Sequence, residues 1–270
     1  MEYYYQIPSH SPLHGTLQNC WQVERQELTE GHETIIPKGT VELIFNLNDW
    51  APLTAQINAQ RFPIPSCMLS GFNSLPIQMQ LPQRHTMFGM VLSPTVAMSL
   101  FRVEASDFVN QCLDLTLVHP HVRNLWEQLM VQPSFAGRVA LGQQWLLSRL
   151  PQVTPQEQFL NQYLNTPATS GLTVPALADQ LCFSPRHLTR KLQTLTGMNA
   201  EQTLLYQKYR YSVELMHTTE LSLTAIAHAC QFTDQAHFSR TFRTFSHLSP
   251  REYRQHKSHI PSHLFAQAAG

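Results

Sequence analysis

Arg190 and Arg240 stand 50 residues apart, and each has a side chain that could bind nucleic acid. A guanidinium group can donate two hydrogen bonds to O6 and N7 of a guanine, which discriminates between bases by about 1–3 kcal/mol. The same group can instead contact a phosphate, or form a salt bridge within the protein, for which Asp234 is near in sequence. We expect a base or phosphate contact at both positions.

The residues around these two arginines repeat with the same offset. Near Arg190, the spacing i, i+3, i+4, i+7 gives one polar side of a helix, made of Arg186, Thr189, Arg190 and Gln193. Fifty residues further on, the equivalent side is made of Ala236, Ser239, Arg240 and Arg243. The opposite side carries Leu188, Leu192 and Leu195 in the first copy and Phe238, Phe242 and Phe245 in the second. The pattern therefore predicts two related helices, each with a buried apolar face.

Polar residues on and near these helices are candidates for contact with DNA. The base-contact candidates are Arg186, Thr189, Arg190, Gln235, Ser239 and Arg240. Gln235 could pair with adenine or only solvate a helix end, and Ser239 could meet a thymine methyl group or allow a close approach. The phosphate candidates are Lys191, Arg243 and Arg254, because phosphates require only positive charge within reach. A solvated surface position is the alternative for Lys191.

Each predicted helix belongs to a longer repeated unit. Ser184 is a suitable N-cap before the first helix, and Asn199 and Ser249 each precede Gln or Glu by three residues, as in a capping box. Residues 172–178 and 221–227 are short helical segments that precede the two units with an offset of 49. A short helix, a tight turn and a second helix form the helix-turn-helix plan, in which the second helix enters the major groove of DNA.

The segment between the two units predicts a single helix over about residues 199–217, with Leu205, Tyr209, Val213 and Met216 along one stripe. Nineteen residues at a rise of about 1.5 Å give a length of roughly 28 Å. Successive major grooves on one face of DNA lie about 34 Å apart. A rigid helix of this length would let one chain place both recognition helices in neighbouring grooves.

Residues 157–256 resemble the DNA-binding domain of AraC/XylS-type transcription regulators. The shared pattern comprises Ile226-Ala227, Phe232-Thr233-Asp234, His237-Phe238-Ser239-Arg240-Thr241-Phe242-Arg243 and Ser249-Pro250-x-x-Tyr253-Arg254. The resemblance implies seven helices, two helix-turn-helix motifs and a role in controlling transcription. The family usually has glycine where Gln231 and His247 stand, and often where Cys182 stands. Those glycines end helices in left-handed conformations, so we expect strain of roughly 1 kcal/mol at each substituted position.

Upstream residues predict a β-rich region with several helices. Strand patterns occur at residues 41–47, 75–81 and 86–92, which suggest a small barrel, such as a cupin-like one, or a sandwich. Helical patterns follow at 94–101, 121–131 and 135–150. The region weakly resembles the sensor domains of one branch of such regulators, through Ile35-Ile36-Pro37-x-Gly39-x-Val41-Glu42-Leu43-Ile44-Phe45-Asn46, Gly71-Phe72 and Phe88-Gly89-Met90. The resemblance implies an effector-binding or protein-interaction role.

The predicted fold class is α+β, with a boundary in the linker Pro151-Gln152-Val153-Thr154-Pro155. We expect a β-rich domain over residues 1–153, an all-α DNA-binding domain over 154–258 and a tail over 259–270. Net charge is zero overall, but residues 1–155 carry 8 basic and 11 acidic side chains and residues 156–270 carry 10 and 7. This split favours a basic C-terminal half. Five widely spaced cysteines, no long apolar stretch and no secretory signal favour a cytoplasmic protein without a membrane span.

Other reactive residues have structural explanations that we favour over chemistry. His187 and His237 are paired by the repeat, but they would face different grooves, so packing or phosphate contact is expected rather than metal binding. His85, His119 and His121 lack the clustered spacing of a cupin metal site. Cys67 has no basic neighbour in sequence to lower its pKa, which favours a buried apolar thiol over a redox sensor. No nucleophile elbow, phosphate loop or HExxH motif occurs, so we expect no enzyme, no metal and no cofactor.

The sequence thus predicts a DNA-binding transcription regulator whose N-terminal domain responds to a ligand or a partner. Double-stranded DNA is the expected partner, and RNA polymerase, a small-molecule effector and a second copy of the chain are further candidates. Two alternatives stay open. One is a protein-interaction modulator that kept the helical scaffold but lost operator binding, and the other is a cupin-like enzyme fused to a DNA-binding module.

Overall fold

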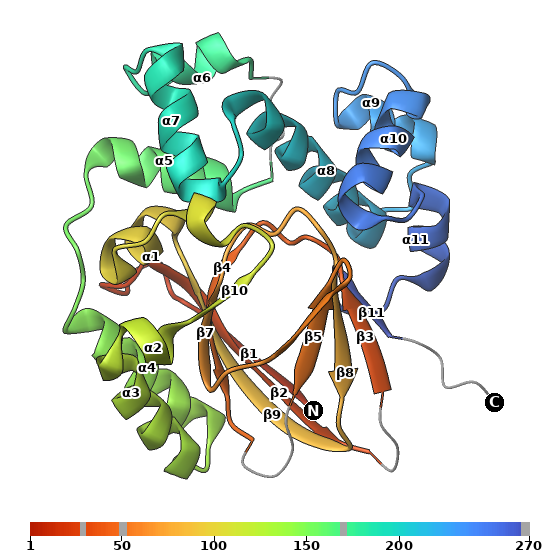
Figure 1. Cartoon of the computed structure of the whole chain (residues 1–270). Helices are drawn as coiled ribbons and strands as arrows, with labels where there is room; N and C mark the ends of the chain where they lie inside the picture. Colours follow the sequence, from red (N-terminus) through yellow and green to blue (C-terminus); the bar gives the residue numbers. More distant parts are fainter. Residues whose placement is uncertain (28–30, 49–52, 168–171, 266–270) are drawn as a thin grey trace.

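The computed structural model describes residues 1–27, 31–48, 53–167 and 172–265. The described residues form two antiparallel sheets, whose strands come from the N-terminal region except for the C-terminal strand β11 (Figure 1). The first has the strand order β1 (Glu2–Gln6), β2 (Leu17–Gln26), β9 (Arg84–Leu92), β4 (Val41–Asn46), β7 (Cys67–Ser70) and β10 (Cys112–Asp114). The second has the order β11 (His263–Phe265), β3 (Gly31–Ile35), β8 (Ile77–Leu81), β5 (Thr54–Ile57) and β6 (Gln60–Pro63).

The three strands predicted from hydrophobic patterns are confirmed as β4, β8 and β9. The sandwich-like alternative is also supported, whereas the closed cupin-like barrel is wrong. Among the described residues, the pairing of each sheet stops at its edge strands, β1 and β10 in one sheet and β11 and β6 in the other, so the sheets do not close on each other. A pattern of short strands specifies pairing along a sheet, but it does not specify whether the last strand meets the first.

Strand β4 shows how one segment serves two cores. Alternate side chains of a strand point to opposite faces of its sheet. Val41, Leu43 and Phe45 enter the larger core, which the N-terminal helices cover, whereas Ile44 enters a smaller core with Met68 and Met87. Because both faces are covered, every residue of β4 is buried, and its sequence is almost continuously apolar.

The three helices predicted before the linker are confirmed as α1 (Pro94–Phe101), α3 (Pro120–Val131) and α4 (Phe135–Leu147). Two short elements, η1 (Ala105–Phe108) and α2 (Leu115–Val118), were not predicted. The predicted stripe residues Leu125, Leu129 and Leu146 are buried, while Trp145 and Leu150 are partly buried against the same core. Among the described helices, none is long and apolar enough to cross a membrane.

The described part of the C-terminal half forms seven helices, as the resemblance implied (Figure 1). They are α5 (Pro155–Asn165), α6 (Val174–Gln180), α7 (Pro185–Thr196), α8 (Ala200–Thr218), α9 (Leu223–Ala229), α10 (Gln235–Ser246) and α11 (Pro250–His256). Helix α5 begins where the linker was predicted to end. Thr154 caps it, in a capping box with Glu157. The exact division of the chain into domains stays a prediction.

The two halves are packed together through helix α8. A Cβ atom at Gly39 would lie only 2.5 Å from Cδ of Arg210 and 2.9 Å from Cε1 of Tyr206, so glycine permits this contact. Gly39 also has a φ of +68°, which glycine adopts without strain. The Tyr206 hydroxyl donates a hydrogen bond to the backbone oxygen of Asn73 at 2.9 Å. The loop before β4 and the loop after β7 therefore both lie against α8.

Candidate nucleic-acid interface

Helix α7 is held by an apolar face and leaves a basic face exposed. Ser184 accepts a hydrogen bond from the backbone N–H of His187, which confirms it as the N-cap, and Pro185 occupies the first turn. Leu188, Leu192 and Leu195 are buried. Arg186 and Arg190 are exposed, and Thr189 is half-buried. The face predicted to contact DNA is therefore accessible.

Helix α10 repeats this arrangement with aromatic packing. Asp234 accepts a hydrogen bond from the backbone N–H of His237 and serves as the N-cap, so its carboxylate is committed to the helix end. The buried residues are Phe238, Phe242 and Phe245. Among the described residues, neither Arg190 nor Arg240 takes part in an ion pair. The salt bridge to Asp234 is thus not formed, and the exposed Arg240 guanidinium faces solvent.

Two of the base-contact candidates make contacts within the second unit. The Oε1 atom of Gln235 accepts a hydrogen bond from the Thr224 hydroxyl at 2.7 Å, which ties the start of α10 to α9. The Ser239 hydroxyl donates to the backbone oxygen of Gln235 at 2.9 Å. The Ser239 hydroxyl proton is therefore used in a hydrogen bond within α10. The small size of this side chain is then the property that would allow a close approach to DNA.

All three phosphate candidates have contacts inside the protein. Lys191 Nζ lies 3.1 Å from Oε1 of Glu157, and Arg243 Nη2 lies 3.5 Å from Oε2 of Glu252. Arg254 Nη2 donates to the backbone oxygen of Leu221 at 2.8 Å.

Glu157 is the partner that Lys191 would have to leave. Partial burial raises the pKa of the Glu157 carboxyl, but hydrogen bonds from Thr154 and Lys191 outweigh this effect and lower that pKa overall. A phosphate contact by Lys191 therefore requires exchange of an existing partner, which reduces its net gain.

Helix α8 joins the two units as one unbroken helix of 19 residues, as predicted. Asn199 and Gln202 form the expected capping box at its start. Tyr206 packs against Phe245 with ring centroids 5.0 Å apart, and Tyr209 packs against Phe242 at 5.3 Å. These contacts fix α8 to the second recognition helix.

Arg210 fixes α8 to the first half of the helical region. Its guanidinium donates hydrogen bonds to the backbone oxygens of Leu164 and Asn165 at the end of α5, and to Oε1 of Gln207 at 2.9 Å. Burial lowers the pKa of Arg210, while nearby tyrosines and Glu214 act in the opposite direction. Figure 1 shows α6–α7 and α9–α10 at the two ends of α8, on the side away from the sheets.

The turns without glycine adopt the left-handed conformation that the resemblance predicted. Cys182 has a φ of 53°, Gln231 a φ of 57° and His247 a φ of 60°. Gly197, which is equivalent to His247 in the first unit, has a φ of 73°. L-residues are disfavoured there, so these turns are strained in three places where a glycine would not be.

Both repeat-related histidines pack on aromatic rings. His187 stacks on Phe183 with centroids 4.3 Å apart, and His237 meets Phe232 edge-on at 5.4 Å. Among the described residues, no group of three or more His, Cys, Asp or Glu side chains is arranged to hold a metal ion. These contacts support the packing interpretation of the two histidines.

The N-terminal candidates are also explained by packing. Cys67 is a free buried thiol, and burial raises its pKa to about 12, so it is a poor nucleophile. His119 Nε2 lies 2.7 Å from the backbone oxygen of Phe101. His85 is buried, and desolvation lowers its pKa, which favours the neutral form.

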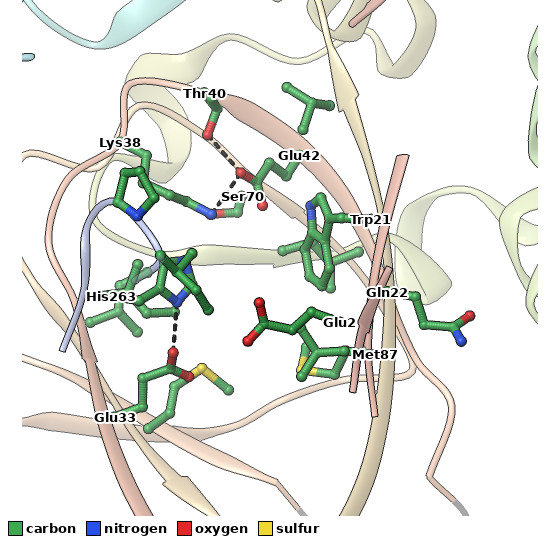
Figure 2. A pocket seen from close by; sticks show the side chains of 18 of the residues that line it. Glu2, Trp21, Gln22, Glu33, Lys38, Thr40, Glu42, Ser70, Met87 and His263 are labelled. Carbon is green, nitrogen blue, oxygen red and sulfur yellow. Dashed lines mark hydrogen bonds and ion pairs between the residues drawn. The ribbon is translucent and has the colours of Figure 1, made fainter. Parts of the chain in front are cut away.

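A cavity in the β-rich region was not foreseen from the sequence. It has a volume of about 690 Å³ and is lined by both sheets and by the C-terminal tail. Figure 2 shows Lys38 and Thr40 directed at the Glu42 carboxylate at one end. The Lys38 Nζ lies 2.8 Å from Oε1 of Glu42, and the Thr40 hydroxyl donates to the same oxygen at 2.7 Å.

Glu42 is the most buried acid in this cavity, at 4% exposure. Burial raises the pKa of its carboxyl, but the charge of Lys38 and hydrogen bonds from Lys38 and Thr40 outweigh that effect, so the pKa lies below its usual value. The sequence Val41-Glu42-Leu43 did not indicate that Glu42 is buried in a cavity, because an acidic residue in a strand is usually exposed.

The geometry defines a class of protein with two helix-turn-helix units on one rigid linker helix, attached to a β-rich domain. Residues 177–256 match a family described as a helix-turn-helix domain, and residues 5–114 match a domain of unknown function, DUF6597. The C-terminal domain is accordingly an AraC-type helix-turn-helix DNA-binding domain.

Two known proteins illustrate the similarity. The transcriptional activator RhaS of Escherichia coli (strain K12) is 39% identical over 80 residues, which is 30% of this chain and 29% of RhaS. The solved structure of ToxT from Vibrio cholerae is 12% identical, covers 89% of this chain and 98% of that chain, and has a TM-score of 0.50. The RhaS match supports the helical domain, and the ToxT match shows a shared two-domain fold.

Proposed function

We propose that the protein is a sequence-specific DNA-binding transcription regulator that places α7 and α10 in successive major grooves. The observation that supports this most directly is the pair of exposed recognition faces at the two ends of one unbroken helix. At a rise of about 1.5 Å per residue, α8 is roughly 28 Å long, close to the spacing of about 34 Å between neighbouring grooves.

Within this proposal, residues divide by the contacts that they could make. The base-contact residues are Arg186, Thr189, Arg190, Gln235, Ser239 and Arg240. Lys191, Arg243 and Arg254 contact phosphates after exchanging their present partners. Arg190 and Arg240 carry most of the discrimination, because each is an exposed arginine at an equivalent position of its unit.

Selection of bound DNA from a random pool tests the proposal. Two conserved blocks separated by about one helical turn, at 10–11 base pairs, are expected if both units bind. A single block would show that only one unit contacts bases. Selected DNA without any preferred sequence would contradict the regulator and favour the protein-interaction modulator, for which the internally paired cations are an argument.

The remaining partners follow from the same proposal. RhaS is named a transcriptional activator, so RNA polymerase is the proposed protein partner of this chain. A small-molecule effector bound by the N-terminal domain and a homodimer are proposed for the β-rich half, and the cytoplasm is the proposed compartment because the DNA must be accessible. We propose no catalytic role, since the similar proteins are regulators.

A further inference from the structure

The cavity between the sheets has the size of a small-molecule site. Its volume of about 690 Å³ lies within the range of about 300–1,000 Å³ that such sites occupy. Ile35, Ile44, Met68, Ile77, Met79 and Met87 form much of its lining. Methionine side chains are flexible and polarizable, so this surface can adapt to the shape of an apolar molecule.

Four acidic side chains that line the cavity lie beside bases, and the two most buried of them form the shortest pairs. Lys38 pairs with Glu42 at 2.8 Å, and Glu33 pairs with His263 at 2.6 Å (Figure 2). Nearer the rim, Glu24 lies 3.8 Å from Arg138, and Glu2 lies 3.6 Å from His259. A charged ligand that bound between the sheets would compete with the Lys38–Glu42 or Glu33–His263 pair and would leave a buried side chain without its partner, which is costly.

The C-terminal tail supplies one side of this cavity. Strand β11 pairs antiparallel with β3, with His263 opposite Ile35. The tail residues that line the cavity are His259, Ile260, Pro261, His263 and Phe265. The tail follows α11 directly, so the DNA-binding half of the chain contributes a wall to a cavity in the other half.

We propose that this cavity is an effector site for a neutral, largely apolar small molecule, and that the C-terminal tail is a required part of the site. The inference rests on the proposed function only for its consequence on DNA. A ligand that packs against Ile260 and Phe265 holds the tail on β3, and the tail carries the effect to the second helix-turn-helix unit.

A short chain of contacts provides the connection. The backbone N–H of Ile36, which lines the cavity, donates to the backbone oxygen of Ser262 at 2.9 Å. The backbone N–H of Ser262 donates to the hydroxyl of Tyr253 at 3.2 Å. Tyr253 is fully buried and packs on Phe242 of α10 with centroids 5.5 Å apart. Tail position is thereby linked to the core of the second recognition helix.

Two fluorescent probes that differ in one group test the ligand class. N-phenyl-1-naphthylamine is neutral, and 1-anilinonaphthalene-8-sulfonate adds a sulfonate to the same rings. The full chain is expected to bind the neutral probe at one saturable site and the sulfonate at least about tenfold more weakly, a difference of about 1.4 kcal/mol. Equal or tighter binding of the sulfonate would overturn the proposed class.

Truncation tests the role of the tail. A chain that ends at Ser258 lacks every lining residue of the tail, whereas a chain that ends at Phe265 keeps them all. The first is expected to lose about tenfold or more in affinity for the neutral probe, which corresponds to about 1.4 kcal/mol, and the second to bind normally. Normal binding by the shorter chain, with unchanged circular dichroism, would show that the tail is not part of the site.

A pair of neighbouring substitutions checks the location. Ile77 lines the cavity, and Gln78 is exposed on the other face of the same strand. Ile77→Trp is expected to fill the cavity and abolish saturable probe binding, while Gln78→Trp leaves it intact. Loss with both variants or with neither, in chains that unfold at the same urea concentration as the parent, would place the probe elsewhere.

Hydrogen exchange tests the connection to DNA binding. The neutral probe is expected to slow exchange in the tail and in α10, and Tyr253→Phe is expected to confine the slowing to the tail. Tyr209→Phe is the control, because the Tyr209 hydroxyl has no hydrogen-bond partner among the described residues. Slowing of α10 that survives Tyr253→Phe would overturn the connection. Probe binding in a chain that lacks sequence-specific DNA binding would refute the regulator but not this site.

Discussion

The two helix-turn-helix units share one plan but are held in different ways. The first unit packs against the N-terminal region, where a Cβ atom on Gly197 would lie 2.2 Å from Cγ2 of Val109. Within the helical half, Lys191 of this unit pairs with Glu157 at the start of α5. The second unit is joined to the N-terminal region through the tail that follows α11. A sensor domain that moves the tail would therefore act on the second unit more directly than on the first.

The two units also differ in the side chains that fill their cores. Leucines 188, 192 and 195 fill the first, whereas phenylalanines 238, 242 and 245 fill the second and contact Tyr209 and Tyr253. Aromatic pairs add about 0.5–1.5 kcal/mol each beyond their buried area. Left-handed non-glycine residues cost about 1–2 kcal/mol each, and the second unit has two, Gln231 and His247. The larger aromatic core can thus offset the strained turns.

The largest expected effect comes from truncating equivalent core residues. Phe242→Ala should lower the free energy of unfolding by about 3–5 kcal/mol, and by more than Leu192→Ala, whose loss lies in a range of about 2–5 kcal/mol. Phe242 is fully buried and touches Tyr209, Phe238 and Tyr253, so its cavity has little room to collapse. Urea denaturation followed by circular dichroism measures both. A smaller loss at Phe242 than at Leu192 would contradict the aromatic compensation.

The next effect separates the units by their contacts with DNA. Arg190→Ala and Arg240→Ala should each weaken binding to the selected operator by about 1–3 kcal/mol and relax the preference at one half of the site. Arg243→Ala is the control, since loss of a phosphate contact should weaken all sequences about equally and reduce the salt slope by about one. Competition titrations with operators altered in either half distinguish the two. Unchanged preference in both halves would remove Arg190 and Arg240 from the interface.

The helical half was largely predictable because its signals are local. The repeat, the caps Ser184, Asn199 and Ser249, and the leucine and phenylalanine stripes each specify a helix end or a buried face within a few residues. The left-handed turns at Gln231 and His247 were likewise predictable, because the similar family usually has glycine at these two positions. The contacts of Lys191, Arg243 and Arg254 were not predictable, because side-chain partners depend on how helices cross.

The cavity and its tail wall left no local signal. Strand β11 has three residues, and its partner β3 lies some 230 residues earlier in the chain, as the contact between His263 and Glu33 shows. Such pairing depends on the position of both segments after folding, which hydrophobic periodicity does not encode. Ser262, with its left-handed φ of 69°, turns the chain into this strand and resembles an ordinary polar residue in sequence.

Gly197 allows the cost of a non-glycine residue to be measured at the left-handed turn of the first unit. Gly197→Ala should lower the free energy of unfolding by about 1–2 kcal/mol through its left-handed backbone alone. The clash with Val109 adds to this loss. The double variant with Val109→Ala should recover only the steric part, and urea denaturation of the single and double variants measures both contributions. Full recovery in the double variant would show that backbone strain is negligible at this turn.

The smallest expected effect is a gain in stability at the equivalent position of the second unit. His247 is exposed and has a φ of 60°, so His247→Gly relieves about 1–2 kcal/mol of left-handed strain. Glycine also gives the unfolded chain more freedom, which costs about 0.4–1 kcal/mol. The net result should be a rise of about 0.5–1 kcal/mol in the free energy of unfolding. His247→Ala, which keeps the strain and removes only the ring, should give no such rise. Equal gains from Gly and Ala in urea denaturation would show that the imidazole ring, and not the backbone, destabilises this turn. The left-handed turn of the second unit would then cost no more free energy than the turn at Gly197 in the first.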